Sequence, residues 1–145
     1  MIHPTLKNDC LLLGRFPLCH VLLMNDANYP WCILVPDREG VSEIYQMSPD
    51  DQQRLATESA ALGECLMQIF SGDKLNIGAL GNVVPQLHVH HIVRYRTDPA
   101  WPAPVWGKLP ATPYSKPQMS KICNKICENL GKWIEFTADS STKTP

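Results

Sequence analysis

Short apolar runs alternate with turn-forming residues over the first third of the chain. Gly14 and Pro17 separate the first two runs, and a turn-rich stretch at 25–30 separates the second run from the third. Short apolar runs bounded by such residues are typical of strands, so we expect successive antiparallel strands here. Two further strands are expected after the middle of the chain. The five predicted strands cover residues 10–13, 18–24, 31–35, 74–80 and 86–96.

Two segments place apolar residues at helical spacing. The first begins at residues 48–51, where Ser is followed by Pro and two Asp, an order typical of a helix N-terminus. We expect Gly72 to end this helix in a left-handed conformation. The second helix is expected at 120–133. The predicted buried residues of the two helices are Leu55, Leu62, Leu66, Ile69, Phe70, Ile122, Ile126, Leu130 and Trp133.

Strands before and after a long helix predict an α+β domain, with an antiparallel sheet of about five strands and two main helices. A chain of 145 residues is the size of one domain. We expect that domain to cover residues 1–136, because residues 137–145 are small and polar and are expected to form a flexible tail. Residues 98–117 contain six prolines, which predicts an ordered loop held by Trp101 and Trp106.

Charge and composition exclude several classes of partner. Thirteen Lys and Arg residues are balanced by fourteen Asp and Glu residues, so the net charge of -1 gives no general attraction for nucleic acid or an anionic membrane. No apolar run is long enough to span a membrane, and the first residues lack the pattern of a secretion signal. We expect a cytoplasmic protein whose six scattered cysteines are free thiols.

The predicted strand at 86–96 carries the candidate chemistry. Side chains alternate across a strand, so one face should display two His, two Arg and a Gln, while the other is a core face. Imidazole, guanidinium and amide groups together suit phosphate oxygens better than a packed core. His91 interrupts the core face, and we expect a core or subunit-contact histidine there. The residues of the polar face are Gln86, His88, His90, Ile92, Arg94 and Arg96.

Two histidines separated by one residue also suit a metal site. His88 and His90 would need a third ligand, for which remote residues such as Cys32 or His20 are candidates. The positive charge of the neighbouring Arg residues disfavours a bound cation. A metal-dependent enzyme therefore remains an alternative, and the main expectation includes no metal and no cofactor.

Residues 81–92, with the sequence GNVVPQLHVHHI, resemble the signature of the histidine-triad (HIT) family. That signature is His-φ-His-φ-His-φ-φ, where φ is apolar, and a Gly-Gln-Ser/Thr-Val stretch precedes it. Placing Gly81 and Val84 on the Gly and Val of that stretch puts a Gln on the first triad position and a His on each of the others. The three triad positions are then Gln86, His88 and His90.

The resemblance implies a nucleotide-binding hydrolase or transferase. Such an enzyme would act on the α-phosphate of nucleoside phosphoramidates, dinucleoside polyphosphates or similar conjugates. The central His88 would be the nucleophile and would form a covalent nucleotidyl-histidine that water then hydrolyses. His90 would donate a hydrogen bond to a phosphate oxygen, while Gln86 would bind phosphate or orient His88 through its backbone carbonyl. A homodimer is implied as well, since many relatives are homodimers.

Residues outside the triad complete the candidate site. The resemblance places a ribose-binding residue at Asn25 or Asp26, although Asn-Asp is equally typical of an ordinary turn. Phosphate contacts are implied for Asn76, in the preceding strand, and for Asn82, in the stretch before the triad. Arg94 fits phosphate binding and a solvated strand end equally well.

Three departures from the family pattern favour an alternative function. Val83 stands where the family has Ser or Thr, Trp31 where it usually has a further His, and Gln86 on the first triad position. These replacements would remove hydroxyl and imidazole groups that assist the leaving group or contact phosphate. A catalytically weak nucleotide-binding or regulatory module is therefore the alternative to an active enzyme.

Overall fold

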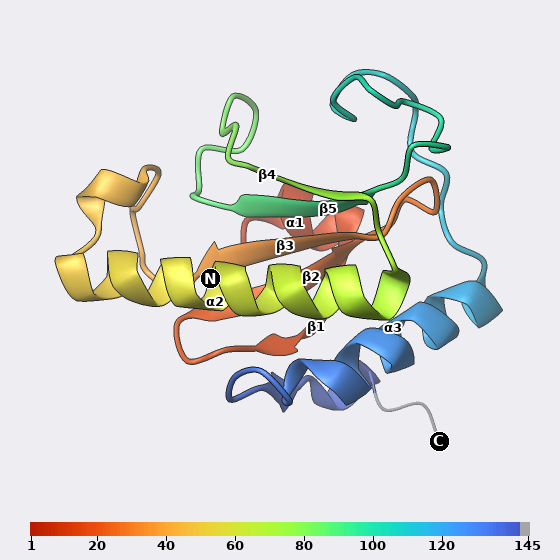
Figure 1. Cartoon of the computed structure of the whole chain (residues 1–145). Coiled ribbons are helices and arrows are strands. Elements are labelled where there is room, and N and C mark those ends of the chain that lie inside the picture. Colours follow the sequence, from red (N-terminus) through yellow and green to blue (C-terminus); the bar gives the residue numbers. More distant parts are fainter. Residues whose placement is uncertain (143–145) are drawn as a thin grey trace.

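The computed structural model describes residues 1–142, which form one antiparallel sheet with helices on both faces (Figure 1). The strand order is β4-β5-β3-β2-β1-β6, and every neighbouring pair is antiparallel. The predicted α+β fold is confirmed. The strands are β1 (Cys10–Arg15), β2 (Cys19–Met24), β3 (Trp31–Pro36), β4 (Lys74–Gly78), β5 (Val89–Arg94) and β6 (Thr137–Ala138). The helices are α1 (Pro4–Asp9), α2 (Pro49–Phe70) and α3 (Lys116–Leu130), with 3-10 turns η1 (Ile44–Gln46) and η2 (Ser140–Thr142).

The sheet has six strands where about five were expected, because β6 pairs with the end of β1. A side chain at Gly14 would collide with the backbone carbonyl of Thr137, so glycine at this position lets the two strands meet. The sheet therefore includes two residues that the sequence placed in the tail. Residues 143–145 of that tail lie outside the described part of the chain.

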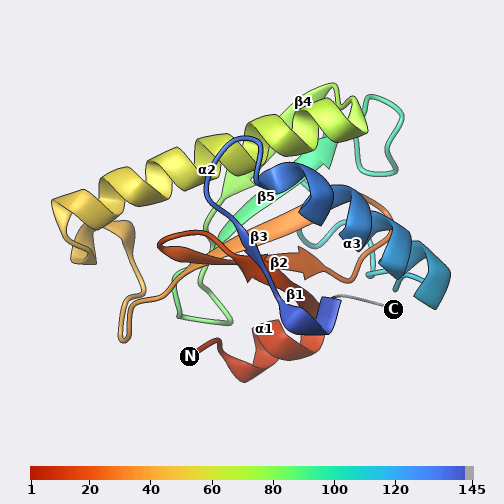
Figure 2. The ribbon, with the colours of Figure 1, turned by 90° about the horizontal axis from the view of Figure 1, so that it is seen from below.

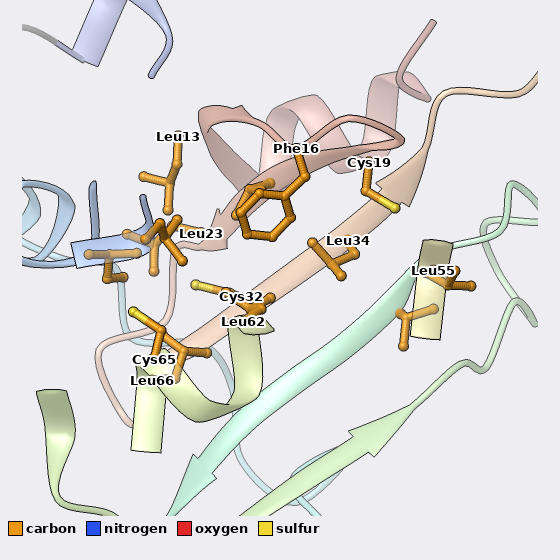
Figure 3. Close-up of a cluster of buried hydrophobic side chains, with 14 of the residues drawn as sticks. Leu13, Phe16, Cys19, Leu23, Cys32, Leu34, Leu55, Leu62, Cys65 and Leu66 are labelled. Atoms are coloured by element: carbon orange, nitrogen blue, oxygen red, sulfur yellow. The ribbon is translucent and has the colours of Figure 1, made fainter. Parts of the chain in front are cut away.

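α2 and α3 cover one face of the sheet (Figure 2). Between them and the strands lies the larger apolar cluster, in which Leu62 and Leu66 of α2 lie near Leu23, Cys32 and Leu34 of the strands (Figure 3). Burying a side chain of this size stabilises the fold by roughly 1.5–3 kcal/mol. All nine predicted core residues of the two helices are buried in this cluster or packed against it, namely Leu55, Leu62, Leu66, Ile69, Phe70, Ile122, Ile126, Leu130 and Trp133.

The ends of α2 show one difference from the sequence prediction. The hydroxyl of Ser48 accepts a hydrogen bond from the Asp51 N–H, as expected for an N-cap. At the other end the left-handed residue is Ser71, with φ of 50°, so the prediction for Gly72 is wrong. Gly72 is instead required for space, because a side chain there would collide with Val93.

α3 begins at Lys116, four residues earlier than predicted, and ends at Leu130. Ser115 caps it by accepting a hydrogen bond from the Gln118 N–H, and Pro117 lies in the first turn, where proline is tolerated. The proline-rich segment therefore runs directly into a helix. Within residues 1–142, no helix has the length and apolar character needed to cross a membrane.

The opposite face of the sheet, which we call the α1 face, is covered by the N-terminal segment and by the segment that carries the tryptophans. A second apolar cluster fills the space beneath them. The two clusters occupy opposite faces because successive strand residues alternate. The buried members of the second cluster are Ile2, Leu6, Leu22, Tyr29, Trp31, Ile33, Val35, Val84, Ile92, Ala100 and Val105.

Candidate active site

β5 lies between β3 and β4, so the triad strand is supported on both sides. His90 is paired with Ile33 of β3 and with Gly78 of β4, and it projects onto the α1 face. Val89 and Val93 belong to the cluster beneath α2 and α3. The predicted division of this strand into a polar and a core face is thereby confirmed.

His88 lies just before β5 and is 7% exposed. Its Nδ1 lies 2.7 Å from the backbone carbonyl oxygen of Gln86. A carbonyl oxygen only accepts, so Nδ1 carries the proton and donates it. Nε2 is then the nitrogen with a free lone pair, and within residues 1–142 it has no hydrogen-bond partner. In the neutral ring, His88 thus presents Nε2 as a nitrogen with a lone pair and no partner.

His90 is 5% exposed and lies among aromatic rings. The rings of Trp31, Trp106 and His88 lie edge-on to it, with centroids 5.6, 5.5 and 5.0 Å away. The indole Nε1 of Trp31 donates a hydrogen bond of 3.0 Å to Nδ1 of His90. Burial, with a smaller contribution from the charges of His88 and His91, lowers the pKa of His90 to about 4. His90 is therefore a neutral imidazole near pH 7.

His91 is a core histidine, as the sequence predicts. It is fully buried on the α2 side of the sheet, and its Nε2 lies 2.7 Å from the hydroxyl of Ser59. Its Nδ1 lies 3.1 Å from the backbone carbonyl of Val89, so both ring nitrogens have partners. Burial lowers the pKa of His91 to about 4. The residue joins β5 to α2 and takes no part in the site on the other face.

The Gln86 side chain holds the N-terminal segment. Its Oε1 accepts a hydrogen bond of 2.8 Å from the backbone N–H of His3, and its Nε2 donates one of 2.9 Å to the carbonyl of Met1. Sequence reasoning did not foresee these contacts, because their partners are backbone groups 83 and 85 residues away. The backbone of Gln86 orients the nucleophile candidate, while its side chain fixes a wall of the site.

A cavity of about 390 Å³ opens beside Gln86. A smaller cavity, which His88 and Gly81 line, adjoins it through the shared residues Ser42 and Gln86. The space beside Gln86 therefore continues towards His88 through these shared residues. Lining residues of the larger cavity include His3, Glu39, Val41, Ser42, Pro85 and Gln86.

Asn25 and Asp26 hold the segment that leads into α3. Oδ1 of Asn25 accepts a hydrogen bond of 2.9 Å from the N–H of Tyr114. Oδ1 of Asp26 accepts one of 3.0 Å from Asn28 and one of 3.2 Å from Thr112, and Asp26 is 4% exposed. The turn chemistry that the sequence also allowed is thus present in the fold.

Arg94 is not a solvated strand end, because its side chain is only 1% exposed. Its Nε and Nη2 donate to the two carboxylate oxygens of Asp98 at 2.8 and 3.0 Å. Nη1 donates to Oδ1 of Asn76 at 2.7 Å, and Nη2 also donates to the carbonyl of Ala103. Arg94 and Asn76 therefore support the tryptophan-bearing loop from inside the fold.

The tryptophan-bearing loop reaches the site through Trp106. The ring of Trp106 packs closely on Gly78, where an added Cβ would lie 3.1 Å from the ring. The other neighbours of the Trp106 ring are Trp31 and His90. The sequence predicted that Trp106 pins the loop, but it did not place the ring against the triad. Asn82 lies exposed in the turn before β5 and has no partner within residues 1–142.

The structure does not assemble the alternative metal site. Cys32 pairs with His91 in the β3–β5 register, so it faces α2 and lies on the opposite side of the sheet from His88 and His90. Burial raises the pKa of the Cys32 thiol well above its usual value, which opposes the thiolate that a metal requires. Within residues 1–142 no group of three or more His, Cys, Asp or Glu residues could hold a metal ion.

Comparison with known proteins gives one consistent result. Residues 5–97 match the HIT domain. The chain is 52% identical to a histidine triad protein from Marinobacter aquaeolei, whose crystal structure aligns over 92% of this chain and 97% of that one with a TM-score of 0.89. No curated protein sequence matches the chain.

Two further crystal structures are similar over almost the whole chain. A histidine triad protein from Bradyrhizobium japonicum is 41% identical, aligns over 90% of this chain and 97% of that one, and gives a TM-score of 0.88. A histidine triad protein from Sinorhizobium meliloti is 40% identical, aligns over 89% and 96%, and gives a TM-score of 0.87.

Proposed function

Because the chain belongs to the histidine-triad family, we propose that it is a nucleotide-binding hydrolase or transferase with His88 as its nucleophile. Its substrates would be nucleoside phosphoramidates, dinucleoside polyphosphates or related conjugates, cleaved at the α-phosphate. The observation that carries this proposal is the orientation of His88, whose Nδ1 is held by the Gln86 carbonyl while Nε2 has no partner within residues 1–142.

The proposed reaction has two displacements at phosphorus. Nε2 of His88 attacks the α-phosphorus, the bond to the leaving group breaks, and the leaving group departs with that electron pair and a proton from water. A second water then attacks the phosphorus and gives its proton to the hydroxide left by the first step, which releases the nucleoside monophosphate and neutral His88. Splitting one hydrolysis into two steps is what covalent catalysis achieves. The Gln86 carbonyl, 2.7 Å from Nδ1, stabilises the positive charge that the ring carries in the intermediate.

The remaining groups of the proposed site are hydrogen-bond donors and acceptors. His90 would donate to a phosphate oxygen, and Asn82, exposed in the turn before β5, would contact phosphate. Asn25 would contact ribose through its amide nitrogen, since its oxygen already accepts the Tyr114 N–H. Donors fixed before the reaction stabilise the charge that develops on a transferring phosphoryl group.

The decisive measurement is AMP release from adenosine 5′-phosphoramidate in the presence of EDTA. We expect turnover by the wild type and a loss of about a thousandfold or more in His88→Ala, because the covalent route is then closed. His20→Ala is the matched control, since His20 lies on β2 outside the triad. Circular dichroism would show that both variants fold. A fully active His88→Ala protein would rule out the proposed nucleophile.

A catalytically weak nucleotide-binding module is the second candidate. It is favoured by Val83, which is 87% exposed and provides no hydroxyl, and by Gln86, whose amide is occupied by backbone groups. Thermal unfolding with adenine and guanine mononucleotides, measured beside turnover, separates the two functions. Stabilisation by a nucleotide without any turnover would support the module.

A further inference from the structure

We propose that Trp31 is a positioning residue for His90, whose indole N–H holds the imidazole as its Nε2–H tautomer. His90 then offers the substrate a neutral donor, fixed in place before the substrate binds. The use of this donor rests on the function proposed above. The tautomer itself is a property of the folded protein and is measurable without any substrate.

The hydrogen bond determines the tautomer. An indole nitrogen can only donate, so the 3.0 Å contact from Nε1 of Trp31 requires a lone pair on Nδ1 of His90. In a neutral imidazole the proton must then be on Nε2. The sheet register makes the contact possible: Trp31 is paired with Ile92 and Ile33 with His90, so Trp31 and His90 are diagonal neighbours on one face.

The surroundings of His90 oppose its protonation. Both Trp31 and His90 are at most 7% exposed, and charging the ring would place a second N–H against the indole N–H. From β5 itself the titratable neighbours are His88 and His91, whose charges also lower the pKa of His90. The other neighbours of the ring are Trp31 from β3, Gly78 from β4 and Trp106 from the tryptophan-bearing loop. None of these three residues titrates. Within residues 1–142, no carboxylate forms an ion pair with His90.

The two triad histidines therefore have opposite hydrogen-bonding states. His88 donates from Nδ1 and keeps a lone pair on Nε2, while His90 accepts at Nδ1 and keeps a proton on Nε2. One ring is prepared to attack phosphorus and the other to bind an oxygen of the phosphate. Since four hydrogen bonds hold the buried Arg94 guanidinium inside the fold, this neutral N–H is a main donor on the face that holds His88.

The test is the protonation state of His90 in the full chain, read from long-range ¹H–¹⁵N spectra of protein with ¹⁵N-labelled histidine. The His90 signals are assigned by their loss in His90→Gln. We expect the wild type to show the Nε2–H tautomer at pH 7 and to remain neutral down to about pH 5. A wild-type His90 that carries its proton on Nδ1, or that is charged at pH 7, would overturn the proposal.

Trp31→Phe removes the indole N–H and keeps an aromatic ring. We expect the Nδ1–H tautomer to appear and the pKa of His90 to rise, because the group that opposed a proton on Nδ1 is gone. Trp106→Phe is the matched control, since Trp106 also packs against His90 but its Nε1 makes no hydrogen bond within residues 1–142. An unchanged tautomer and pKa in Trp31→Phe would show that Trp31 does not position the ring.

Turnover of adenosine 5′-phosphoramidate provides the second readout. We expect kcat/KM to fall about tenfold in Trp31→Phe, because the Nδ1–H tautomer has no proton on Nε2 to donate, and to fall less in Trp106→Phe. Equal losses in the two variants would contradict a positioning role and indicate packing alone. A wild type that has the expected tautomer but no turnover would overturn the proposed function, while the assignment of the tautomer to Trp31 would stand.

Discussion

Gln86 shows how one residue can serve two parts of the fold, through its side chain and through its backbone. Its amide has one acceptor and one donor at the same end, which match an N–H and a C=O of a passing chain. Both are used, on His3 and Met1. The contact with His88 comes from the backbone carbonyl, which any residue at position 86 provides.

Gln86→Ala should therefore loosen the N-terminal segment more than it harms the nucleophile. Losing two hydrogen bonds to the backbone should lower the free energy of unfolding by about 1–2 kcal/mol. We expect faster amide hydrogen exchange in residues 1–9 and retention of the His88 orientation. Gln118→Ala, which removes a similar bond at the start of α3, is the control. Unchanged exchange in residues 1–9 would contradict the role assigned to the amide.

Arg94 is a second residue whose task depends on its partners. Burial alone would raise the pKa of Asp98, but hydrogen bonds from Arg94 and from the N–H groups of Tyr95 and Ala100 lower it below its usual value. The buried pair thus remains ionised and joins β5 to the loop.

Arg94→Lys should be strongly destabilising although it conserves the charge. A lysine cannot reach Asp98, Asn76 and Ala103 together, because it lacks the planar fork of the guanidinium. We expect the free energy of unfolding to fall by about 3 kcal/mol in urea titrations. Arg96→Lys is the control, since Arg96 is exposed, and it should change the free energy of unfolding by less than about 0.5 kcal/mol. Equal values for the two variants would contradict the buried network.

At the level of elements, the sequence predicted what depends on local pattern. The period of two along β5 placed His88 and His90 on one face and His91 on the other, and the helical spacing in α2 identified its buried residues. Contacts between distant segments were not predictable. The resemblance places Trp31 where the family usually has a further His, yet its indole contacts His90 on the neighbouring strand. No local pattern predicts which residues of two strands become neighbours.

The pH dependence of stability is a property of β5. His90 and His91 have pKa values of about 4 in the fold, against about 6.5 in an unfolded chain. Between these values the unfolded chain binds more protons, so stability is complete above pH 6.5 and falls as the pH falls towards 4. We expect the free energy of unfolding in urea to drop by about 3 kcal/mol between pH 6.5 and 5.

His91→Gln isolates the core histidine in this pH series. The variant cannot titrate at position 91, so its free energy of unfolding should fall about half as much between pH 6.5 and 5 as that of the wild type. A wild-type stability that is flat across this range would show that neither buried ring is neutral in the fold.

At the scale of the whole molecule, the two edges of the sheet differ. β6 has two residues, and so short an edge offers little to pair with. β4 has five residues and leads into a stretch of exposed apolar side chains, with Ile77 51%, Leu80 49% and Val83 87% exposed. An unpaired edge beside apolar groups is typical of a surface that pairs with another strand. We propose that two copies pair their β4 edges antiparallel and form a homodimer.

Ile77→Lys tests this dimer, because a charged side chain on an edge strand opposes pairing and must lose water on association. Light scattering after size exclusion should give twice the 16.3 kDa chain mass for the wild type and a single chain for the variant. Tyr45→Lys is the control, since Tyr45 is 78% exposed on η1, outside β4, and should leave the dimer intact. A monomeric wild type, or a dimer that Ile77→Lys leaves unchanged, would place the association elsewhere or exclude it.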